Sequence, residues 1–432
     1  MFGIEITKAV YKNENNMFLL GDITQGAKEG LSSYAGKVDM IYLDPPFYTN
    51  QKHIIRQRVG ALGHLGNRQY LLDIPNEFDR FDTKEIFMDY MRQLLEVAHE
   101  LLSPKGSIYI HVDYRASAMV RLLADEIFGE KNLLNEIIWH YKSGGRAKNF
   151  YSRKHDNIYF YKKRFRPYFN PEAVGSKRGE ERRNNMKRNV DKDGKVYYSI
   201  RSAGKEYRYY ADATIYPDDV WSDISHLQQK DPERTGYPTQ KPVALLSRMI
   251  AASCPEGGLV CDLCCGSGTT AVAAALLGRR FLGMDKNPLS LLFTRRRMLL
   301  LDEGFASIGE TEMQRPAQVD YSMTKGDGRS ILLKDYRIDG YENPYKEGDK
   351  GLVSQVTLGN LDLIPSAMGD ITLVDHASIG YVRDGVYHVK DVVVRSNKYP
   401  YIQDVLHMDL EQGIPTLAIA DVYGNYSFHP LS

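Results

Sequence analysis

The sequence lacks long apolar runs and an obvious leader. No run of apolar residues is long enough to cross a membrane, and Met1 to Glu5 show no secretory signal pattern. We therefore expect a soluble, cytoplasmic protein with no membrane partner. The formal net charge is only +1, so the charge of the whole chain does not indicate one class of partner.

Cysteine is also scarce, and its four copies are clustered. Cys254, Cys261, Cys264 and Cys265 all lie within twelve consecutive residues. The spacing Cys261-x-x-Cys264 would suit half of a zinc site, but no second pair and no nearby histidine completes it. We predict no metal site and interpret these cysteines as small buried residues that pack a strand and a turn.

The size and composition of the chain are those of a large globular protein. With 432 residues, 43% of them hydrophobic, it can bury a substantial core in two or three domains. Apolar residues recur at helical spacing from Lys84 to Leu102, and the pattern predicts a helix there. Residues 48–80 show no clear periodicity, so we expect a long loop or lid. Lys52, Arg56, Arg58 and Arg68 would allow it to contact a polyanion, and a solvated loop is the alternative.

A stiff turn follows one short apolar run. Val38 to Leu43 predicts a buried strand, and Asp44-Pro45-Pro46-Phe47 follows it directly. Prolines fix φ and stop strand pairing, so Asp44 and Phe47 are held on a rigid loop at the strand's carboxyl end, where open α/β sheets bind ligands. An ordinary strand-to-loop turn is the alternative.

That loop has the groups needed to activate a planar amine. The Asp44 carboxylate can accept one hydrogen of an exocyclic NH2 group, and the Pro45 carbonyl can accept the other. Two acceptors favour tetrahedral nitrogen and free its lone pair for attack. Phe47 offers a face on which an extruded base can stack.

A glycine-rich turn occurs late in the chain. Leu259 to Asp262 predicts a strand, and Cys264, Gly266, Gly268 and Thr269 lead into an alanine-rich helix ending near Leu277. Glycines let the backbone approach a ligand, and the helix amino terminus adds N–H donors. Asp285 ends the next predicted strand, 19 residues after Gly266, a separation that suits an acid binding ribose hydroxyls.

Residues 142–210 are strongly basic. They carry 20 Lys and Arg against 7 Asp and Glu, a balance of +13, with nine interleaved tyrosines. Cations neutralise phosphates and aromatic rings stack on or wedge between bases, so the interval predicts a DNA-binding surface. A solvated charged face or a disordered insert is the alternative. The candidate DNA-binding residues are Arg146, Lys148, Arg153, Lys154, Arg182, Arg183, Lys187 and Arg188.

Three of these motifs together resemble a known family. Asp44-Pro45-Pro46-Phe47 is similar to the D-P-P-[YF] catalytic motif of DNA amino-methyltransferases, which use S-adenosylmethionine. The glycine turn resembles their D-x-F-x-G-x-G-T cofactor motif, with Cys264 at the phenylalanine position. Residues 238–242 resemble their P-T-Q-K-P phrase. The order of catalytic motif, basic region and cofactor motif resembles the β group of the family.

The resemblance implies a fold and a cofactor site. The expected fold is α/β, a circularly permuted doubly wound sheet of about seven strands carried by residues 17–300. Asp22, at the end of a predicted strand, matches the acid that approaches the cofactor's adenine, although it could instead cap the next helix. Thr239, Lys241 and Pro242 mark the entry to the site, where Lys241 could meet the methionine carboxylate. Asp262, Cys264, Gly266, Gly268, Thr269 and Asp285 complete the predicted cofactor set.

The resemblance also implies the substrate. Asp at position 44 favours N6 of adenine, because the cytosine-N4 enzymes of the family usually have Ser-Pro-Pro-Tyr. Bases in double-stranded DNA are stacked, so the target base must be flipped. We therefore predict a site-specific adenine-N6 DNA methyltransferase of a restriction-modification or similar system. Cytosine-N4 or RNA methylation, and a non-catalytic DNA-binding subunit, are the alternatives.

The predicted domain organisation has four parts. Residues 1–141 form the catalytic half, 142–230 a strand and the basic target-recognition region, and 231–300 the cofactor-binding half. Residues 301–432 carry 11 Lys and Arg against 20 Asp and Glu, a balance of −9, with short β-like runs. We expect a mostly β accessory domain that avoids DNA and binds a partner protein, a second copy or the catalytic domain.

Overall fold

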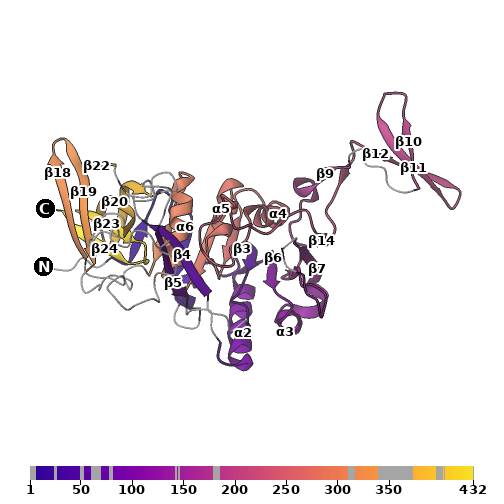
Figure 1. Ribbon diagram of the computed structural model, residues 1–432, viewed down its shortest axis with the longest axis horizontal. Helices are drawn as coiled ribbons and strands as arrows, with labels where there is room; N and C mark the ends of the chain where they lie inside the picture. Colours follow the sequence, from indigo (N-terminus) through magenta and orange to yellow (C-terminus); the bar gives the residue numbers. More distant parts are fainter. Residues whose placement is uncertain are drawn as a thin grey trace.

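The structure is a computed structural model that describes most of the chain. The described residues are 6–23, 27–48, 53–59, 70–76, 81–141, 144, 146–178, 185–309, 317–338, 373–395, 402 and 404–431. They form an elongated mixed α/β molecule built on one large sheet. A three-stranded sheet projects at one end, and a long hairpin lies at the other (Figure 1).

The central strands place the ends of several motifs along one edge. In the order β7-β8-β6-β3-β15-β16-β2, strands β6 (Leu102–Val112), β3 (Val38–Leu43), β15 (Leu259–Asp262), β16 (Arg280–Asp285) and β2 (Met17–Leu20) are mutually parallel. Strand β8 (His155–Lys162) is antiparallel to β6 and to β7 (Leu133–His140). Parallel strands share their carboxyl edge, so the residues that follow β3, β15, β16 and β2 meet there.

Helices cover both faces of these strands. Helices α4 (Val243–Ser253), α5 (Thr269–Leu276) and α6 (Pro288–Leu300) pack through residues such as Leu246, Ala271 and Phe293 into one core. Helix α2 (Lys84–Leu101) packs into the opposite core through residues such as Leu94, with α3 (Ser117–Ala124) beside it. The helix expected from Lys84 is therefore confirmed. None of the helices in the described part of the chain combines the length and apolar character that a membrane crossing requires.

The prediction of a loop over residues 48–80 was wrong for the described part of that interval. Strands β4 (His53–Val59) and β5 (Tyr70–Asn76) pair as an antiparallel hairpin. The hairpin is supported by distant contacts, since Gln57 is buried and accepts a hydrogen bond from Arg395 at 2.5 Å. Its Nε2 also donates to the Val422 carbonyl. These partners lie more than 300 residues away, so local periodicity did not reveal them.

The large sheet continues beyond the seven strands expected from the sequence. Strand β17 (Ala306–Ile308) pairs with β2, and β1 (Lys8–Val10) joins β17 to β21 (Val386–Val394). Strands β20 (Val374–Arg383), β23 (Ile414–Asp421) and β24 (Tyr426–Pro430) complete the fourteen-stranded order. Most described residues after 301 are in strands, as expected. The expected run 354–358 lies outside the described residues, and the division into four domains stays a prediction.

A buried ionic cluster joins this C-terminal part to the rest. Asp375 Oδ2 lies 2.6 Å from Arg296 Nη1 of α6 and 2.9 Å from Arg395 Nε. Asp375 is fully buried. Burial alone would raise its pKa, but the two guanidinium groups hold it well below the usual range. The cluster therefore ties α6, the β4–β5 hairpin and β20 together.

The basic interval contains the projecting sheet of Figure 1. Strands β10 (Lys187–Val190), β11 (Val196–Ser202) and β12 (Lys205–Tyr210) pair antiparallel in sequence order. The Tyr197 and Tyr210 rings lie 5.4 Å apart, and the Arg208 guanidinium is 5.2 Å from the Tyr197 ring centroid. We call residues 187–210 the arm.

Candidate active site

A cavity opens at the shared carboxyl edge of the parallel strands. Its lining comes from the turns after β2, β3, β15 and β16 and from the segment before α4. Twelve of the fourteen catalytic and cofactor residues expected from the sequence line it: Asp22, Asp44, Pro45, Pro46, Phe47, Thr239, Lys241, Asp262, Cys264, Gly266, Thr269 and Asp285. Pro242 and Gly268 are not among the lining residues.

The catalytic loop and Lys241 meet inside this cavity. Lys241 Nζ donates to Asp44 Oδ2 at 2.5 Å and lies 5.1 Å from the centroid of the Phe47 ring. Asp44 Oδ1 is buried and has no hydrogen-bond partner among the described residues. A buried acceptor without a donor costs free energy, so this oxygen is poised to accept a hydrogen bond from a ligand.

A chain of hydrogen bonds supports the loop from behind. The Tyr42 hydroxyl lies 2.8 Å from His111 Nδ1, and His111 Nε2 lies 3.2 Å from Asp156 Oδ2. The Tyr141 hydroxyl donates to Asp156 Oδ1 at 3.2 Å. His111 is fully buried, and its ring is 6.3 Å from Phe47. Both histidine nitrogens are thus engaged, so His111 holds neighbouring side chains in place.

The glycine turn is organised by two acids. Asp262 accepts a hydrogen bond from Cys264 N at 3.0 Å and another from the Thr270 hydroxyl. Gly266, at φ +52°, donates its N–H to Asp285 Oδ2 at 2.8 Å. Both acids therefore shape the backbone that lines the cavity.

A packing requirement explains glycine at position 268. Its φ is +75°, and a Cβ atom there would overlap Thr294 of α6. Glycine at this position lets the turn pack against α6. It shapes the cavity without lining it, and Pro242 likewise lies just outside, as the residue that precedes α4.

Asp262 is an unusual carboxyl group. Burial is the main cause that raises its pKa to about 7; the nearby Asp44 and Asp285 carboxylates act in the same direction, and the hydrogen bonds from Thr270 and Cys264 act against it. Near neutral pH this acid therefore holds a proton more readily than an ordinary carboxyl group. A cation bound beside it would favour the charged form.

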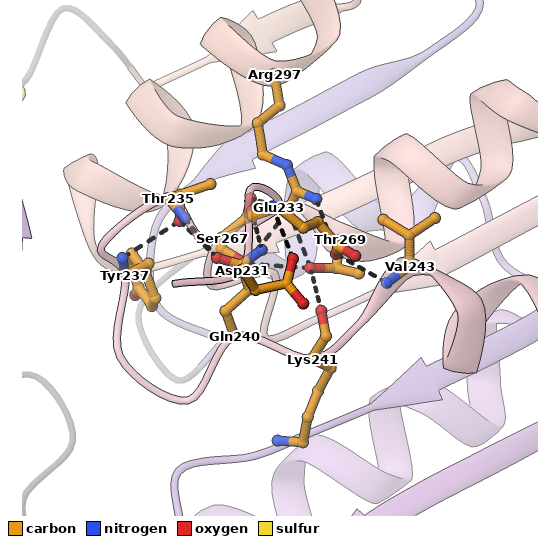
Figure 2. A network of polar contacts seen from close by, with 10 residues as sticks. All are labelled: Asp231, Glu233, Thr235, Tyr237, Gln240, Lys241, Val243, Ser267, Thr269 and Arg297. Carbon is orange, nitrogen blue, oxygen red and sulfur yellow. Dashed lines mark hydrogen bonds and ion pairs between the residues drawn. The ribbon is translucent and has the colours of Figure 1, made fainter. Parts of the chain in front are cut away.

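A polar network holds the segment that carries Lys241 (Figure 2). Thr269 Oγ1 donates to the Lys241 carbonyl at 3.1 Å, and Arg297 Nη1 donates to Thr269 Oγ1 at 3.0 Å and to the Ser267 carbonyl at 2.9 Å. Glu233 accepts from Val243 N at 2.9 Å, so the start of α4 is bound to the same network. The network positions the backbone of Lys241 on the glycine turn.

The residues of the cavity fit S-adenosylmethionine. Asp22, Asp262 and Asp285 supply acceptors around the glycine turn, where its hydroxyl and ammonium groups would bind. The unpartnered Asp44 oxygen lies in the same cavity. When bound, the cofactor supplies an electrophilic methyl group on a positively charged sulfur.

The predicted DNA-binding residues fall into two groups. Arg146, Lys148 and Arg153 are exposed in the loop between β7 and β8, where Lys154 is half-buried. Lys187 and Arg188 are exposed on β10 of the arm. Arg182 and Arg183 lie outside the described residues.

Sequence reasoning missed several residues that line the cavity. Tyr42, Tyr90, Arg115, Tyr237 and Lys286 are the main ones. Tyr42 could have been found, because it lies two residues before Asp44 and alternate strand residues share a face. Tyr90 and Arg115 come from α2 and from the turn after β6, and no local pattern marks them.

Comparison with known proteins identifies the family. The model of a family described as DNA methylase, of the N6/N4 methyltransferase type, matches residues 38–291. The chain therefore belongs to this DNA methylase family, and it is an S-adenosylmethionine-dependent DNA methyltransferase. The match includes both the catalytic loop and the glycine turn.

The individual relatives described below are each less than 30% identical to this chain. The chain is 28% identical over 309 residues to the type II methyltransferase M2.DpnII of Streptococcus pneumoniae, covering 68% of this chain and 94% of that protein. It is 27% identical over 300 residues to the DNA adenine methyltransferase YhdJ of Escherichia coli K12, covering 68% and 86%. Among solved structures, the PvuII cytosine-N4-specific DNA methyltransferase is 14% identical with a TM-score of 0.44, covering 69% and 90%.

Proposed function

We propose that this DNA methyltransferase transfers the methyl group to N6 of a flipped adenine in double-stranded DNA. The observation that carries the proposal is the Asp44 carboxylate, with one oxygen bound to Lys241 and the other unpartnered in the cavity. The relative named a DNA adenine methyltransferase supports the choice of adenine. Relatives named type II methyltransferases support a restriction-modification role.

The proposed mechanism needs no covalent enzyme intermediate. Asp44 Oδ1 accepts one hydrogen of the adenine amine, and the Pro45 carbonyl accepts the other. Phe47 stacks on the ring and fixes its plane. The loop thereby orients the nitrogen lone pair towards the electrophilic methyl group, and orientation supplies much of the rate. After transfer the nitrogen loses a proton, for which Asp44 Oδ1 is the nearest proposed acceptor.

Lys241 has a different part in this mechanism from the one expected from the sequence. Its ammonium group is bound to Asp44 Oδ2, so we propose that it orients the catalytic carboxylate. Contact with the methionine carboxylate is the alternative role.

The remaining cavity residues are proposed to hold the cofactor. Asp285 would accept the ribose hydroxyls; its two oxygens also accept N–H groups of Gly266 and Asn287, which fix the orientation of the carboxylate. Asp22 lines the cavity where the adenine is proposed to lie. Asp262 would stabilise positive charge on the methionine portion.

We propose that the catalytic sheet is the circularly permuted doubly wound sheet that the β group has. The order β7-β8-β6-β3-β15-β16-β2, with β8 antiparallel, supports this assignment. The chain reaches the catalytic strand β3 before the cofactor strand β15, although the two strands are neighbours.

The arm and the loop between β7 and β8 are the proposed DNA-binding surfaces. Exposed cations on both support this assignment, because phosphate contacts require accessible charge. The acidic C-terminal part is proposed to brace the catalytic part, and a partner protein or a second copy could bind its outer strands.

Product analysis tests the proposal. The purified protein is incubated with labelled S-adenosylmethionine and unmodified genomic DNA, and the DNA is digested to nucleosides. We expect label in N6-methyladenine, and mapping of the modified bases then gives the recognition site. Label in N4-methylcytosine would contradict the adenine assignment and leave DNA methylation intact.

The Asp44→Ala variant provides the matched control. Loss of one preorganised group at the reacting atoms should lower the single-turnover rate by about 100- to 1000-fold. Binding of cofactor and of DNA should change little. Transfer at the wild-type rate would rule out the proposed function of this loop.

A further inference from the structure

Three large aromatic side chains are exposed in the turn after β6 and in the loop between β7 and β8. Tyr151 is 98% exposed and Phe150 59% exposed in the loop between β7 and β8, and Tyr114, after β6, is 43% exposed. Exposing this much aromatic surface to water is unfavourable unless a ligand covers it. The exposed cations of the same loop, Arg146, Lys148 and Arg153, favour a polyanion as that ligand.

The loop that carries Tyr151 is braced. Arg153 Nη1 donates to the Tyr114 hydroxyl at 2.6 Å, and its guanidinium carbon lies 4.3 Å from the Tyr114 ring centroid and 4.8 Å from that of Phe150. Ala147 N donates to Ser152 Oγ at 3.0 Å across the turn. Tyr141 N donates to the Lys154 carbonyl at 3.0 Å at its base. Tyr151 therefore stands on a supported turn.

The contact between Arg153 and Tyr114 also connects the loop to the mouth of the cavity. Tyr114 is followed by Arg115, whose side chain lines the cavity and whose Nε donates to Asp113 Oδ2 at 2.6 Å. The aromatic cluster is thus attached to the wall of the pocket that is proposed to receive the flipped base. With the target base in that pocket, an exposed ring on this loop would lie beside the stack that the base leaves.

We propose that Tyr151 enters the base stack of the duplex and fills the gap left by the extruded target base. This inference rests on the proposed function, because it requires a flipped base. Flipping costs stacking energy, and a ring inserted into the gap restores part of it. Phe150 and Arg153 support the inserted ring from the protein side, and Arg146 and Lys148 contact the flanking phosphates. Tyr151 is thus a positioning residue that lies outside the catalytic loop.

The test compares Tyr151→Ala with wild-type protein on two duplexes that carry the mapped recognition site. One duplex is fully paired, and the other has an abasic position opposite the target base. The gap-filling proposal predicts a single-turnover rate about 10-fold or more lower on the paired duplex, as expected for loss of one aromatic stacking contact. It predicts near-complete recovery on the abasic duplex, where little pairing energy opposes flipping. Tyr151→Trp should keep the wild-type rate on both.

Tyr207→Ala is the matched control, since Tyr207 is 46% exposed on the arm and away from this loop. Any effect of Tyr207→Ala should be equal on the two duplexes. If Tyr151→Ala methylates the paired duplex at the wild-type rate, or loses the same factor on both duplexes, Tyr151 does not fill the gap and the proposal is wrong.

A second measurement separates this inference from the proposed function. With 2-aminopurine at the target position, extrusion raises its fluorescence without any methyl transfer. A rise with wild-type protein that Tyr151→Ala loses would support gap filling even if the methylated base proved not to be adenine. A rise that Tyr151→Ala keeps in full would overturn the gap-filling proposal whatever the product is.

Discussion

Asp44 combines one bound oxygen and one unpartnered oxygen in the same carboxylate. The bound oxygen accepts from Lys241 Nζ at 2.5 Å, and the two side chains are only 16% and 9% exposed. Little water therefore screens the pair, and the lysine restricts rotation of the carboxylate. The two roles considered for Lys241, orienting Asp44 or binding the cofactor carboxylate, predict different defects when its charge is removed.

Lys241→Met separates those two roles. The variant keeps an unbranched side chain over Phe47 but loses the N–H donor. Losing a hydrogen bond to a charged group corresponds to about 1.5–3 kcal/mol, so we expect a single-turnover rate about 10- to 150-fold lower with nearly unchanged cofactor affinity. Calorimetry and rapid-quench kinetics measure the two quantities. Lys230→Met, at an exposed position, is the control. A large loss of cofactor affinity at an unchanged rate would instead favour the carboxylate-binding role.

The raised pKa of Asp262 predicts that the affinity for the cofactor depends on pH. Its pKa is raised to about 7 in the protein without cofactor, mainly by burial. A cationic ligand binds the ionised form better, so binding lowers this pKa and releases a proton. Affinity should therefore rise with pH by up to about tenfold per unit below 7, and level off above it. Titration calorimetry from pH 6 to pH 8.5 measures this, and Asp262→Asn should flatten the profile. A flat wild-type profile would contradict it.

Among single residues, the sequence predicted those that follow a strand end and missed those brought in by folding. Asp44, Asp262 and Asp285 were predicted because each ends an apolar run, and all three line the cavity. The contact between Lys241 and Asp44 spans 197 residues, and no spacing rule predicts it. The roles of these residues, as distinct from their positions, stay predictions.

Among the elements of the fold, the arm is the surface whose proposed contact with DNA can be tested by removing charge. Its strands project from the body of the molecule (Figure 1), and Lys187 and Arg188 point to opposite faces of β10. A duplex lying against either face would be contacted by one of them. Neutralising both tests the whole strand.

Lys187→Gln with Arg188→Gln should weaken DNA binding and reduce its salt dependence. Each lost phosphate contact lowers the slope of log K against log salt by about 0.9. Fluorescence anisotropy at several salt concentrations measures the slope, and cofactor binding should not change. Lys325→Gln with Lys334→Gln, on the hairpin of β18 (Ala317–Lys325) and β19 (Gly328–Ile338) at the opposite end of Figure 1, is the matched control. Equal slopes for the two double variants would show that the arm's cations are only solvated.

Elements with strong local patterns were predicted well, and those held by distant contacts were not. Helix α2 begins at the expected Lys84 because Thr83 caps it, and its apolar residues face the core. The β4–β5 hairpin was predicted as a loop because the contacts that hold it are distant ones. Gln57 is buried against Arg395 and Val422. A polar residue that is buried by a remote segment gives no local apolar signal.

For the whole molecule, the decisive feature is the sheet that runs from the catalytic strands into the C-terminal ones. Strand β1, near the amino terminus, lies between β17 and β21 and links the two parts. The Asp375 cluster joins the same parts through side chains. The excess of acidic residues in the C-terminal part can be counted from the sequence. The burial of Asp375 cannot be predicted from it.

Asp375→Asn should destabilise the whole protein. Arg296 and Arg395 would keep their charges without a carboxylate, and breaking a buried ion pair in this way costs about 3–5 kcal/mol. Thermal and denaturant unfolding should show a single transition at a lower midpoint, because the sheet is continuous. Asp384→Asn, at an exposed turn residue with φ +48°, is the control and should change stability little. A separate early transition that leaves cofactor binding intact would show that the C-terminal part unfolds alone.

The four cysteines have a practical consequence for experiments on this protein. All are free, burial raises the pKa of each thiol, and Cys264 and Cys265 line the cavity, with Cys264 the less buried of the two. Protonated, enclosed thiols react slowly with alkylating reagents. Modification of Cys264 should therefore slow further when the cofactor covers it. Modification of Cys254 and Cys261 should follow the rate at which the core opens, so one reagent reports on both occupancy and unfolding.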